Sequence, residues 1–416
     1  MLILLLLCII FALGFWAYLN FSPTQRMNAR FQYGAADTPD SQNGLFRGDD
    51  VTWGFAGDPE SWPAVTIVVP GRNEGHVLAD TLGSLCRFDY PRLRIVFIND
   101  QSTDNTREVC ATLQRQYSHL EALHNEEPPR DGWIGKSWAV HLGLMQPAAR
   151  EAELLLFTDA DLEFHPLALK QAVRLLLHRR ADLVSLLPRL RVGSLGELLA
   201  LLAGMTLIST ALPLRRVNEP NFPKGLAAGG FMLWRKASYD AIGGHESVRG
   251  QMIEDIALAK LAKTKGKRVF TTFARDLMTA RMYEGWRDTF VGLRKNAYAG
   301  VMYSPINAVA SIVAILAGII LVPVYVALGT FLWITQPSPL TFVICLLSYL
   351  AMACMLSAAN RSAKLLGFHR YAGWLMPFGM AFYMCIFVAS IIEHYRGGNT
   401  WAGRRVQTKD KLIDIR

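Results

Sequence analysis

The 416-residue chain has only six cysteines, and they follow no metal-binding or redox pattern. No CxxC pair and no zinc-ligand spacing is present, which excludes a thiolate zinc site. Only Cys86 and Cys110 fall in the polar middle of the chain. The other four lie in apolar blocks: Cys8, Cys345, Cys354 and Cys385. This distribution is consistent with a reducing compartment.

Two further absences exclude classes of protein. No basic run is interleaved with aromatic residues, so a nucleic-acid partner is not expected. The segment GWIGKS (Gly132–Ser137) resembles a phosphate-binding P-loop, but that motif requires a glycine separated by four residues from its Gly-Lys pair. This chain has Arg130 at that position, and the match fails. Internal repeats and low-complexity segments are absent as well.

Charged residues are scarce too, at 19% of the chain against 51% hydrophobic residues. Residues 1–19 carry no charge and are long enough to span a bilayer, which takes about 20 apolar residues. A cleaved signal peptide is the alternative, but no basic segment opens the chain and no small-x-small cleavage site precedes Asn20. We therefore expect an uncleaved anchor over residues 1–20.

Three more apolar blocks, at about 305–334, 339–358 and 371–392, predict membrane-spanning helices after the polar middle. The positive-inside rule places that middle in the cytoplasm, because three arginines follow the first span: Arg26, Arg30 and Arg47. The net charge of +9 favours binding to the surface of an anionic membrane and to a substrate that carries phosphate. Three C-terminal crossings would leave the basic tail outside, so either one block is re-entrant or split, or the tail breaks the rule.

The polar middle alternates apolar runs with helical patterns. Helices are predicted from Glu74 to Arg87, from Thr103 to Gln116 and after Pro166. Because the runs between them are apolar throughout, they indicate strands of a parallel sheet covered on both faces. The predicted strands are Val65–Pro70, Arg94–Asp100, residues 120–124, Leu154–Asp159 and Asp182–Pro188.

Three aspartates stand at the carboxyl ends of these strands, where open α/β sheets bind ligands. Asp100 ends the second strand, and the segment TDAD after the fourth contains Asp159 and Asp161. An acidic loop or a helix N-cap would also explain TDAD on its own. The second acidic strand end favours a site for Mg²⁺ or Mn²⁺, which carboxylates and substrate phosphates hold together. Asp161 is the first candidate metal ligand. Asp159 is a candidate to bind either the metal or the ribose of a nucleotide.

The segment Ser194–Pro213 is apolar and about long enough to cross a bilayer. A simple crossing would separate its two flanks, although both carry candidate site residues. Arginines lie on both sides: Arg189, Arg191, Arg215 and Arg216. Residues 194–213 are therefore predicted to form a helix in the membrane interface, with a core helix as the alternative.

Four motifs resemble, in their order, those of family 2 glycosyltransferases: VPGRNE, INDQSTDNT, TDAD and IED. Together they cover about 65–300. Among these enzymes the chain is most similar to the hopene-associated glycosyltransferases, and ceramide glucosyltransferase is a more distant cousin. The features that carry this closer similarity are the arrangement of spans and the segments PPRDGWIGKSWA, IEDIALAK and RMYEGW. The resemblance implies the GT-A fold of nucleotide-diphospho-sugar transferases, an α/β fold with a Rossmann-like mixed sheet, here with N-terminal and C-terminal transmembrane helices. It also implies inversion at the anomeric carbon.

With this resemblance the domain organisation can be predicted in full. In chain order we expect an N-terminal transmembrane anchor at 1–20, a linker at 21–62, a cytoplasmic GT-A catalytic domain at 63–300 that includes the interfacial helix, C-terminal transmembrane helices at 301–395, and a basic tail at 396–416. The expected location is the inner membrane of a bacterium.

The resemblance implies roles for the residues that bind the donor. Pro70, Arg72 and Glu74, at the end of the first strand, would hold the uracil of a UDP-sugar or a similar base. Asp100 would contact the base or the ribose, and the TDAD aspartates would take the ribose and the metal. Many family members have two adjacent acids where this chain has Asn99 followed by Asp100, so only Asp100 is carried over.

Other motif residues have a structural alternative beside their implied role. Asp255 would be the catalytic base and Glu254 its neighbour in the site, although acids at a helix start need no function. Lys136 would bind the donor's phosphates, and the alternative is that it is a surface lysine without a role. Gly229 and Gly230 would border the acceptor pocket, form a tight turn, or do both.

RMYEGW (Arg281–Trp286) resembles the (Q/R)xxRW signature, but its arginine is missing and its tryptophan stands one residue late. By that resemblance, Arg281 would pair with the diphosphate and Trp286 would stack under the acceptor.

The predicted function is that of a membrane-bound, inverting, metal-dependent hexosyltransferase. It would move a sugar from a nucleotide-diphosphate donor to a hydroxyl of a lipid, with hopanoid and sphingolipid-like acceptors as candidates. A processive polysaccharide synthase, a non-catalytic protein that binds nucleotide sugars or lipids, and a nucleotidyltransferase remain alternatives. The first of these needs more spans and an intact signature, and the second leaves Asp161 and Asp255 unexplained.

Overall fold

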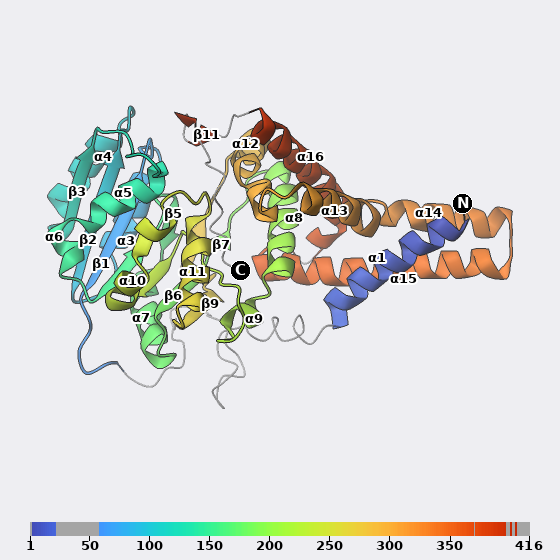
Figure 1. Cartoon of the computed structure of the whole chain (residues 1–416), viewed down its shortest axis with the longest axis horizontal. Helices are drawn as coiled ribbons and strands as arrows, with labels where there is room; N and C mark the ends of the chain where they lie inside the picture. The colour runs from blue at the N-terminus through green and yellow to red at the C-terminus, as the bar shows by residue number, and fades with distance from the viewer. Residues whose placement is uncertain (1, 22–57, 370, 397–399, 402–403, 406–416) are drawn as a thin grey trace. The chain divides into compact units, whose positions relative to one another are not determined.

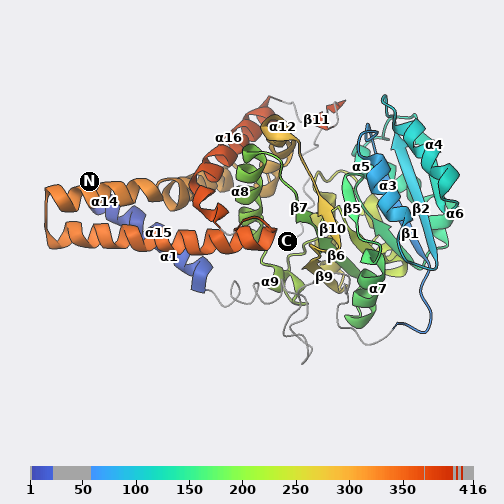
Figure 2. The same cartoon turned by 180° about the vertical axis from the view of Figure 1, so that it is seen from behind.

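The computed structural model describes residues 2–21, 58–369, 371–396, 400–401 and 404–405 (Figures 1 and 2). The chain divides into two compact units, which we call the sheet unit and the helical unit. The sheet unit comprises Arg30–Arg191, Leu214–Met282 and Thr400–Arg416. The helical unit comprises Met1–Ala29, Val192–Pro213 and Tyr283–Asn399. Most of the predicted linker, 21–62, and of the predicted tail, 396–416, lies outside the described residues.

Seven strands form the main sheet, in the order β3-β2-β1-β4-β8-β6-β9. They are β1 (Val65–Gly71), β2 (Leu93–Asp100), β3 (Leu120–Asn125), β4 (Leu154–Phe157), β6 (Leu183–Leu187), β8 (Met232–Arg235) and β9 (Val269–Phe273). β8 pairs antiparallel with both of its neighbours, and the other neighbours pair in parallel. The sheet is therefore mixed, as the family resemblance implies. The five strands predicted from apolar runs, β1, β2, β3, β4 and β6, all run in one direction, as expected. The antiparallel strand is β8, for which no strand was predicted from the sequence.

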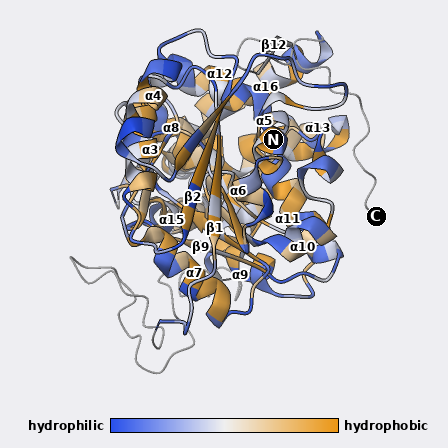
Figure 3. Ribbon diagram, turned by 90° about the vertical axis from the view of Figure 1, so that its left-hand side faces the viewer, coloured by the Kyte–Doolittle hydropathy of each residue, from blue (hydrophilic) through white to orange (hydrophobic). Residues whose placement is uncertain are grey.

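The central strands are buried on both faces, which explains their uninterrupted apolar sequences. Ile67, Val68 and Val69 of β1 have no exposed surface, and Figure 3 shows β1 and β2 as hydrophobic ribbons. On one face, α5 (Gly135–Leu144) packs directly on the two strands. A Cβ added to Gly143 of this helix would lie 2.6 Å from side-chain carbons of both Val68 and Ile98. The close approach of helix and sheet thus depends on a glycine.

Amphipathic helices complete the sheet unit. In α7 (Ala168–His178) the fully buried residues Leu169, Ala172, Val173 and Leu176 follow helical spacing, so one face of the helix enters the core. The remaining helices are α3 (Leu78–Cys86), α4 (Thr106–Gln116), α6 (Pro147–Arg150), α9 (Leu214–Asn218), α10 (Lys236–Ala241), the 3-10 helix η1 (Gly244–Val248) and α11 (Glu254–Thr264). A small sheet has the order β5-β10-β7, and a short pair joins β11 to β12. These strands are β5 (Leu162–Phe164), β7 (Arg189–Leu190), β10 (Met278–Ala280), β11 (Thr400–Trp401) and β12 (Arg404–Arg405).

Helices make up the helical unit. They are α1 (Leu2–Phe21), α8 (Leu195–Ala211), α12 (Gly285–Ala297), α13 (Pro305–Ile315), α14 (Val322–Thr335), α15 (Pro339–Leu366) and α16 (Met376–Tyr395), with short turns η2 (Ala299–Val301), η3 (Leu316–Ile320) and η4 (Ala372–Leu375). All the long helices except the charged, amphipathic α12 are apolar. Among the described residues, three helices are long and apolar enough to cross a membrane: Leu2–Asn20, Pro339–Leu366 and Ala372–Tyr395.

The apolar block at 305–334, expected as one crossing, is divided. A π-helical turn, η3, separates α13 from α14, and α14 opens with Pro323, which has no N–H to donate. Residues Gly285–Val301 and Pro305–Ile320 form a pair bent by 112°, which is either a broken span or a re-entrant loop. A split or re-entrant block is one of the two solutions that the sequence left open for the basic tail.

Buried hydrogen bonds tie α1 to the rest of the helical unit. Trp16 Nε1 donates to the Gly318 carbonyl at 2.7 Å, within the π-helical turn. Asn20 Nδ2 donates to the Cys354 carbonyl at 2.7 Å, and Asn20 Oδ1 accepts from Arg361 Nη2 at 2.6 Å. The polar groups of Trp16 and Asn20 are therefore satisfied inside the helical unit.

The N-termini of α8 and α12 share one buried carboxylate. Ser194 caps α8 and Glu197 completes the S-x-x-E pattern of a capping box. Glu197 Oε2 also accepts from the Gly193 N–H at 2.6 Å, and Oε1 from the Gly285 N–H at 2.7 Å. Trp286 follows directly, so close to α8 that a Cβ on Gly196 would lie 2.4 Å from Trp286 Cβ.

Candidate active site

The sheet brings the ends of three neighbouring strands to one edge. β1 pairs in parallel with β2 and with β4, and Val65 is in register with both Leu93 and Leu154. Beyond these ends come the loop after β1, Asp100 at the end of β2, and TDAD after β4. The Thr158 hydroxyl of TDAD donates to the Gly230 carbonyl at 2.8 Å, which joins the segment to the loop before β8.

Aromatic packing fixes the loop that leads into α5 and so places Lys136. The Trp133 ring lies 4.6 Å from the His141 ring, and Trp138 stacks on His141 at 5.5 Å. The Ile134 N–H donates to the Arg249 carbonyl at 3.0 Å, which ties the loop to the segment before α11. Lys136 is thereby held in the first turn of α5, although a cation is unfavourable at that end of a helix dipole.

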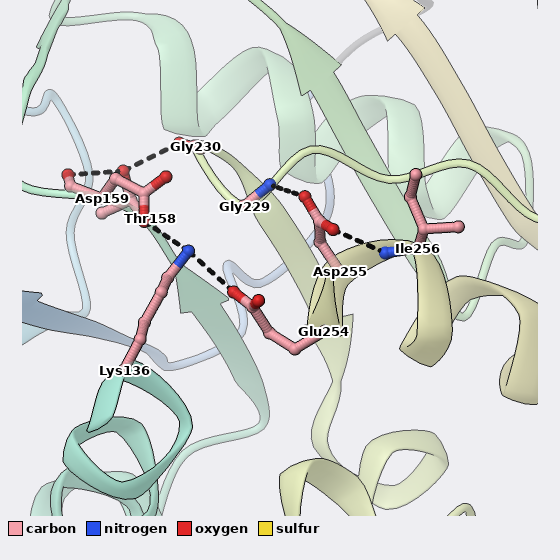
Figure 4. Close-up of polar contacts among 8 residues, drawn as sticks. All are labelled: Lys136, Thr158, Asp159, Gly229, Gly230, Glu254, Asp255 and Ile256. Atoms are coloured by element: carbon pink, nitrogen blue, oxygen red, sulfur yellow. Dashed lines mark hydrogen bonds and ion pairs between the residues drawn. The ribbon is translucent and has the colours of Figure 1, made fainter. Parts of the chain in front are cut away.

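Carboxylates from two motifs compensate for that position. Lys136 Nζ lies 2.6 Å from Asp159 Oδ1 and 2.7 Å from Glu254 Oε1, so one ammonium group bridges TDAD and IED (Figure 4). Burial disfavours its charge, but the carboxylates of Asp159, Glu254 and Asp255 outweigh burial and raise the pKa of Lys136 well above its ordinary value. The lysine is part of the site rather than a solvated surface residue.

Asp255 stands at the start of α11 and is oriented by two backbone groups. Its Oδ2 accepts from the Gly229 N–H at 2.8 Å and its Oδ1 from the Ile256 N–H at 2.7 Å (Figure 4). Burial and the neighbouring Glu254 raise the pKa of Asp255 to about 7, against the lowering influence of Lys136 and of the two N–H groups. A carboxylate with this pKa can accept a proton near neutral pH.

Asp161 carries a similar shift for a related reason. Burial, the charge of Asp159 and the charge of Glu74 raise the pKa of Asp161 to about 7, and Lys136 offsets part of the effect. The edge of the sheet thus concentrates more negative charge than one lysine neutralises. A bound cation would relieve this repulsion.

Position 229 requires a glycine because neighbouring side chains leave no room for a Cβ, and not because of its backbone dihedral angles. Gly229 is absent from the glycines with positive φ. A Cβ there would lie 2.6 Å from Lys136 Nζ, 3.3 Å from Asp159 Oδ2 and 3.6 Å from Asp255 Oδ2. At Gly230 the added Cβ would meet only Leu162, at 3.1 Å. Gly229 therefore faces the charged groups, whereas Gly230 packs on the core.

Asp100 is held rigidly at the end of β2. It is 1% exposed, and its Oδ1 accepts from Asn125 Nδ2 at 2.7 Å and from Gln101 Nε2 at 3.2 Å. Asn99, which stands where many family members have a second acid, instead bonds His124 Nδ1 at 3.2 Å. The Asn99 side chain is thus engaged by the neighbouring strand β3.

Three other predicted residues have different surroundings. Arg72 lies just beyond β1, and its Nε and Nη1 are buried with no hydrogen-bond partner within the described residues. Arg281 follows β10 and is exposed. Trp286 belongs to the helical unit, where it packs on Gly196. The implied roles of Arg281 with the diphosphate and of Trp286 at the acceptor stay predictions.

With this geometry known, comparison with known proteins decides the family. The model of glycosyl transferase family 21 matches residues 49–404. The chain belongs to glycosyl transferase family 21. It is therefore a glycosyltransferase, and the predicted membership of the family 2 group is confirmed.

Curated relatives of this family 21 glycosyltransferase include 4,4'-diaponeurosporenoate glycosyltransferases of Staphylococcus aureus. That of strain USA300 is 28% identical over 250 residues, which cover 57% of this chain and 61% of the relative. That of strain MRSA252 is 29% identical over 268 residues, which cover 61% of this chain and 66% of the relative. The match thus spans less than two thirds of each relative's length.

A solved structure shows the fold. It is the mannosyltransferase PcManGT from Pyrobaculum calidifontis, in complex with GDP-Man and Mn²⁺, with a TM-score of 0.51 and 16% identity. The likeness covers 93% of this chain and 99% of that one. Together with the mixed sheet, it confirms the predicted GT-A fold with N-terminal and C-terminal apolar helices.

The acidic edge of this glycosyltransferase suits a metal that arrives with its substrate. Among the described residues, no three His, Cys, Asp or Glu side chains are grouped as a complete metal site. Asp159 and Asp161 could supply two carboxylate ligands, and hard divalent ions commonly take the rest from substrate phosphates and water. The charge repulsion that raises the pKa of Asp161 fits this requirement.

Three residues that support the predicted ones had no role assigned from the sequence. Asn125 and Gln101 hold Asp100, and Asp104 bonds the loop that contains Glu74. Asp104 was visible within INDQSTDNT as part of a motif. Asn125 follows an ordinary strand, and only the pairing of β3 with β2 brings it to Asp100.

Proposed function

We propose that this glycosyltransferase moves a sugar from a nucleotide-diphosphate donor to an oxygen nucleophile on a membrane lipid, with inversion at the anomeric carbon. The observation that carries the proposal is the charged cluster in which Lys136 bridges Asp159 and Glu254 next to Asp255. It combines, at one sheet edge, a cation for a departing diphosphate with a base of pKa about 7.

The donor's nucleotide is assigned to the ends of β1 and β2. Arg72 offers buried nitrogens that still need acceptors, and Asp100 offers a carboxylate whose orientation is fixed. Such groups suit hydrogen bonding to a base and ribose. A UDP-sugar is our first candidate donor, and a GDP-sugar is the second because PcManGT was solved with GDP-Man.

In the proposed reaction, the acceptor hydroxyl gives its proton to Asp255 as its oxygen attacks the anomeric carbon. The bond from that carbon to the diphosphate oxygen breaks, and its electron pair leaves with the diphosphate. Lys136, released from its carboxylates, would balance part of the developing charge. Mg²⁺ or Mn²⁺, held by Asp161 and Asp159 with the donor, would neutralise the rest when bound.

A lipid acceptor is supported by the helical unit, with its three membrane-length helices. We place the protein in a bacterial inner membrane with the sheet unit cytoplasmic, since Arg26, Arg30 and Arg47 follow the first span. The relatives are named for the glycosylation of 4,4'-diaponeurosporenoate, a carboxylate. A carboxylate nucleophile needs no base, so the raised pKa of Asp255 favours a hydroxyl, as in hopanoid or sphingolipid-like acceptors.

Donor selection with purified protein and a lipid extract of its native membrane tests the proposal. Each UDP-, GDP- and dTDP-sugar is supplied with Mg²⁺ or Mn²⁺, and lipid products are identified by mass. We expect one new glycolipid, which disappears with EDTA and in Asp255→Asn but persists in the control Asp276→Asn, an exposed acid. No product from any donor by a folded protein would contradict the proposal, and diphosphate release from a nucleoside triphosphate would indicate a nucleotidyltransferase.

A further inference from the structure

Two loops of the sheet unit, at the carboxyl ends of adjacent parallel strands, are hydrogen-bonded to each other. The first follows β1 and contains Arg72 and Glu74, and the second follows β2. At Asn73 the contacts run in both directions. Its N–H donates to Ser102 Oγ at 2.9 Å, and its Oδ1 accepts from the Thr103 N–H at 2.8 Å.

The Asp104 carboxylate is at the centre of this junction. Its Oδ2 accepts from the Gly75 N–H at 3.0 Å, and its Oδ1 accepts from the Thr106 hydroxyl at 2.5 Å and the Thr106 N–H at 3.1 Å. Thr106 Oγ1 in turn accepts from the Glu74 N–H at 3.0 Å. One carboxylate therefore fixes two consecutive backbone amides of the first loop, those of Glu74 and Gly75.

Both loops need such support because of their backbone conformations. Asn73 and Gln101 each have a φ of 58°, in the left-handed region that residues other than glycine rarely occupy. The loops also approach closely, since a Cβ on Gly75 would lie 2.0 Å from Asn105 Oδ1. Slight burial acts to raise the pKa of Asp104, but its hydrogen bonds to Thr106 and Gly75 outweigh this and lower it, so the carboxylate is charged at neutral pH.

We propose that Asp104 is a positioning residue for nucleotide binding, which holds the loop with Arg72 and Glu74 at the sheet edge without touching the donor. Its three hydrogen-bond donors come from both sides of the junction, since Gly75 follows β1 and Thr106 begins α4 after β2, so this one carboxylate joins the two segments. The inference rests on the proposed function, because it assumes that Arg72 and Glu74 meet the nucleotide of a sugar donor.

Calorimetry on the full chain in detergent tests it, with UDP and GDP as probes in the presence of Mn²⁺. In Asp104→Asn the amide would present N–H groups to the Gly75 N–H, so one charge-assisted bond is lost. We expect the nucleotide Kd and the donor KM to rise about tenfold, while kcat changes less than about threefold, since the chemistry lies at Asp255. Asp80→Asn, an exposed acid in the first turn of α3, is the matched control and should leave both constants unchanged.

Combination with Glu74→Gln separates positioning from stability. If Asp104 acts through this loop, the double variant should lose less binding than the two single losses combined. Unchanged binding by a folded Asp104→Asn, while the wild type binds normally, would overturn this inference alone. So would a loss in kcat with no change in Kd. Failure of the wild type to bind any nucleotide diphosphate would overturn the proposed function, and this inference with it.

Discussion

The ammonium group of Lys136 neutralises carboxylates from two motifs that are far apart in the sequence. Because it lies against Asp159 and Glu254, it would compete with a metal for the Asp159 carboxylate in the absence of donor. When the donor arrives, its phosphates can attract both the lysine and the metal. The same side chain would then serve as an internal counter-ion before binding and as an electrophilic group afterwards.

This dual role makes a prediction for Lys136→Met. We expect transfer to fall by about a hundredfold, as when one charge-stabilising group is removed from an active site. In the same variant, Mn²⁺ should bind more tightly without nucleotide, because two carboxylates have lost their cation. Titration of Mn²⁺ by electron paramagnetic resonance measures this, with the exposed Lys265→Met as control. Weaker Mn²⁺ binding in Lys136→Met would refute the competition.

His245 predicts a pH dependence of stability in the sheet unit. It is 2% exposed, and Tyr239 Oη bonds its Nδ1 at 2.5 Å. Burial, with smaller contributions from Lys136 and His141, lowers its pKa to about 3, against about 6.5 in an unfolded chain. The folded state therefore excludes a proton that the unfolded state binds. His245 costs no stability above pH 6.5, and below it the free energy of unfolding falls by up to about 1.4 kcal/mol per pH unit.

Raised pKa values at Asp161 and Asp255 act in the opposite direction as the pH falls, so the measurement must compare variants. Denaturant unfolding of the wild type and His245→Asn at pH 7.5 and pH 5.5 isolates the histidine. We expect the variant to be less stable at pH 7.5 but to lose less on acidification. An equal loss in both proteins would show that His245 does not carry the effect.

At the scale of secondary-structure elements, the hydrophobic period and the length of a segment predict the presence and type of an element better than its first and last residues. The apolar runs located β1, β2, β3, β4 and β6. The helix predicted from Glu74 begins only at Leu78, because the intervening backbone is bonded to the loop after β2. No strand was predicted at β8, because an apolar run of four residues does not by itself indicate a strand or its direction. Cross-loop bonds and strand direction depend on partners distant in sequence.

The junction of α8 and α12 supplies a prediction at this scale. Glu197 is 1% exposed and accepts from the N–H groups of Gly193 and Gly285. Removing its carboxylate in Glu197→Ala takes two charge-assisted bonds from the partly exposed N–H groups of Gly193 and Gly285, at a cost of about 2 kcal/mol in stability. Thermal unfolding in detergent should show a midpoint several degrees lower, whereas Glu108→Ala, exposed on α4, should match the wild type. An unchanged midpoint in Glu197→Ala would mean that the two helices are held by apolar packing alone.

At the scale of the whole molecule, each of the two compact units is assembled from separate stretches of the chain, and the predicted domain bounds stay a prediction. The predicted domain at 63–300 contains two segments, Val192–Pro213 and Tyr283 onward, that belong by their contacts to the helical unit. Sequence composition marked 194–213 as apolar, but only tertiary contact shows what that segment packs on. α8 approaches α16 so closely that a Cβ on Gly379 would lie 2.7 Å from the Leu199 carbonyl oxygen.

A truncated chain tests this organisation. Residues 58–300 lack α1 and the C-terminal helices, and would leave bare the face of α8 where Gly204 and Leu199 meet Tyr383 and Gly379. We expect this chain to remain in the membrane or detergent fraction on sedimentation, although it retains none of the three membrane-length helices. A second chain that ends at residue 282 and replaces 193–212 by a Gly-Ser linker should move to the aqueous fraction, because it has lost the apolar α8 and the amphipathic α12. If the first chain is already monodisperse without detergent, α8 is a core helix rather than a membrane-facing one.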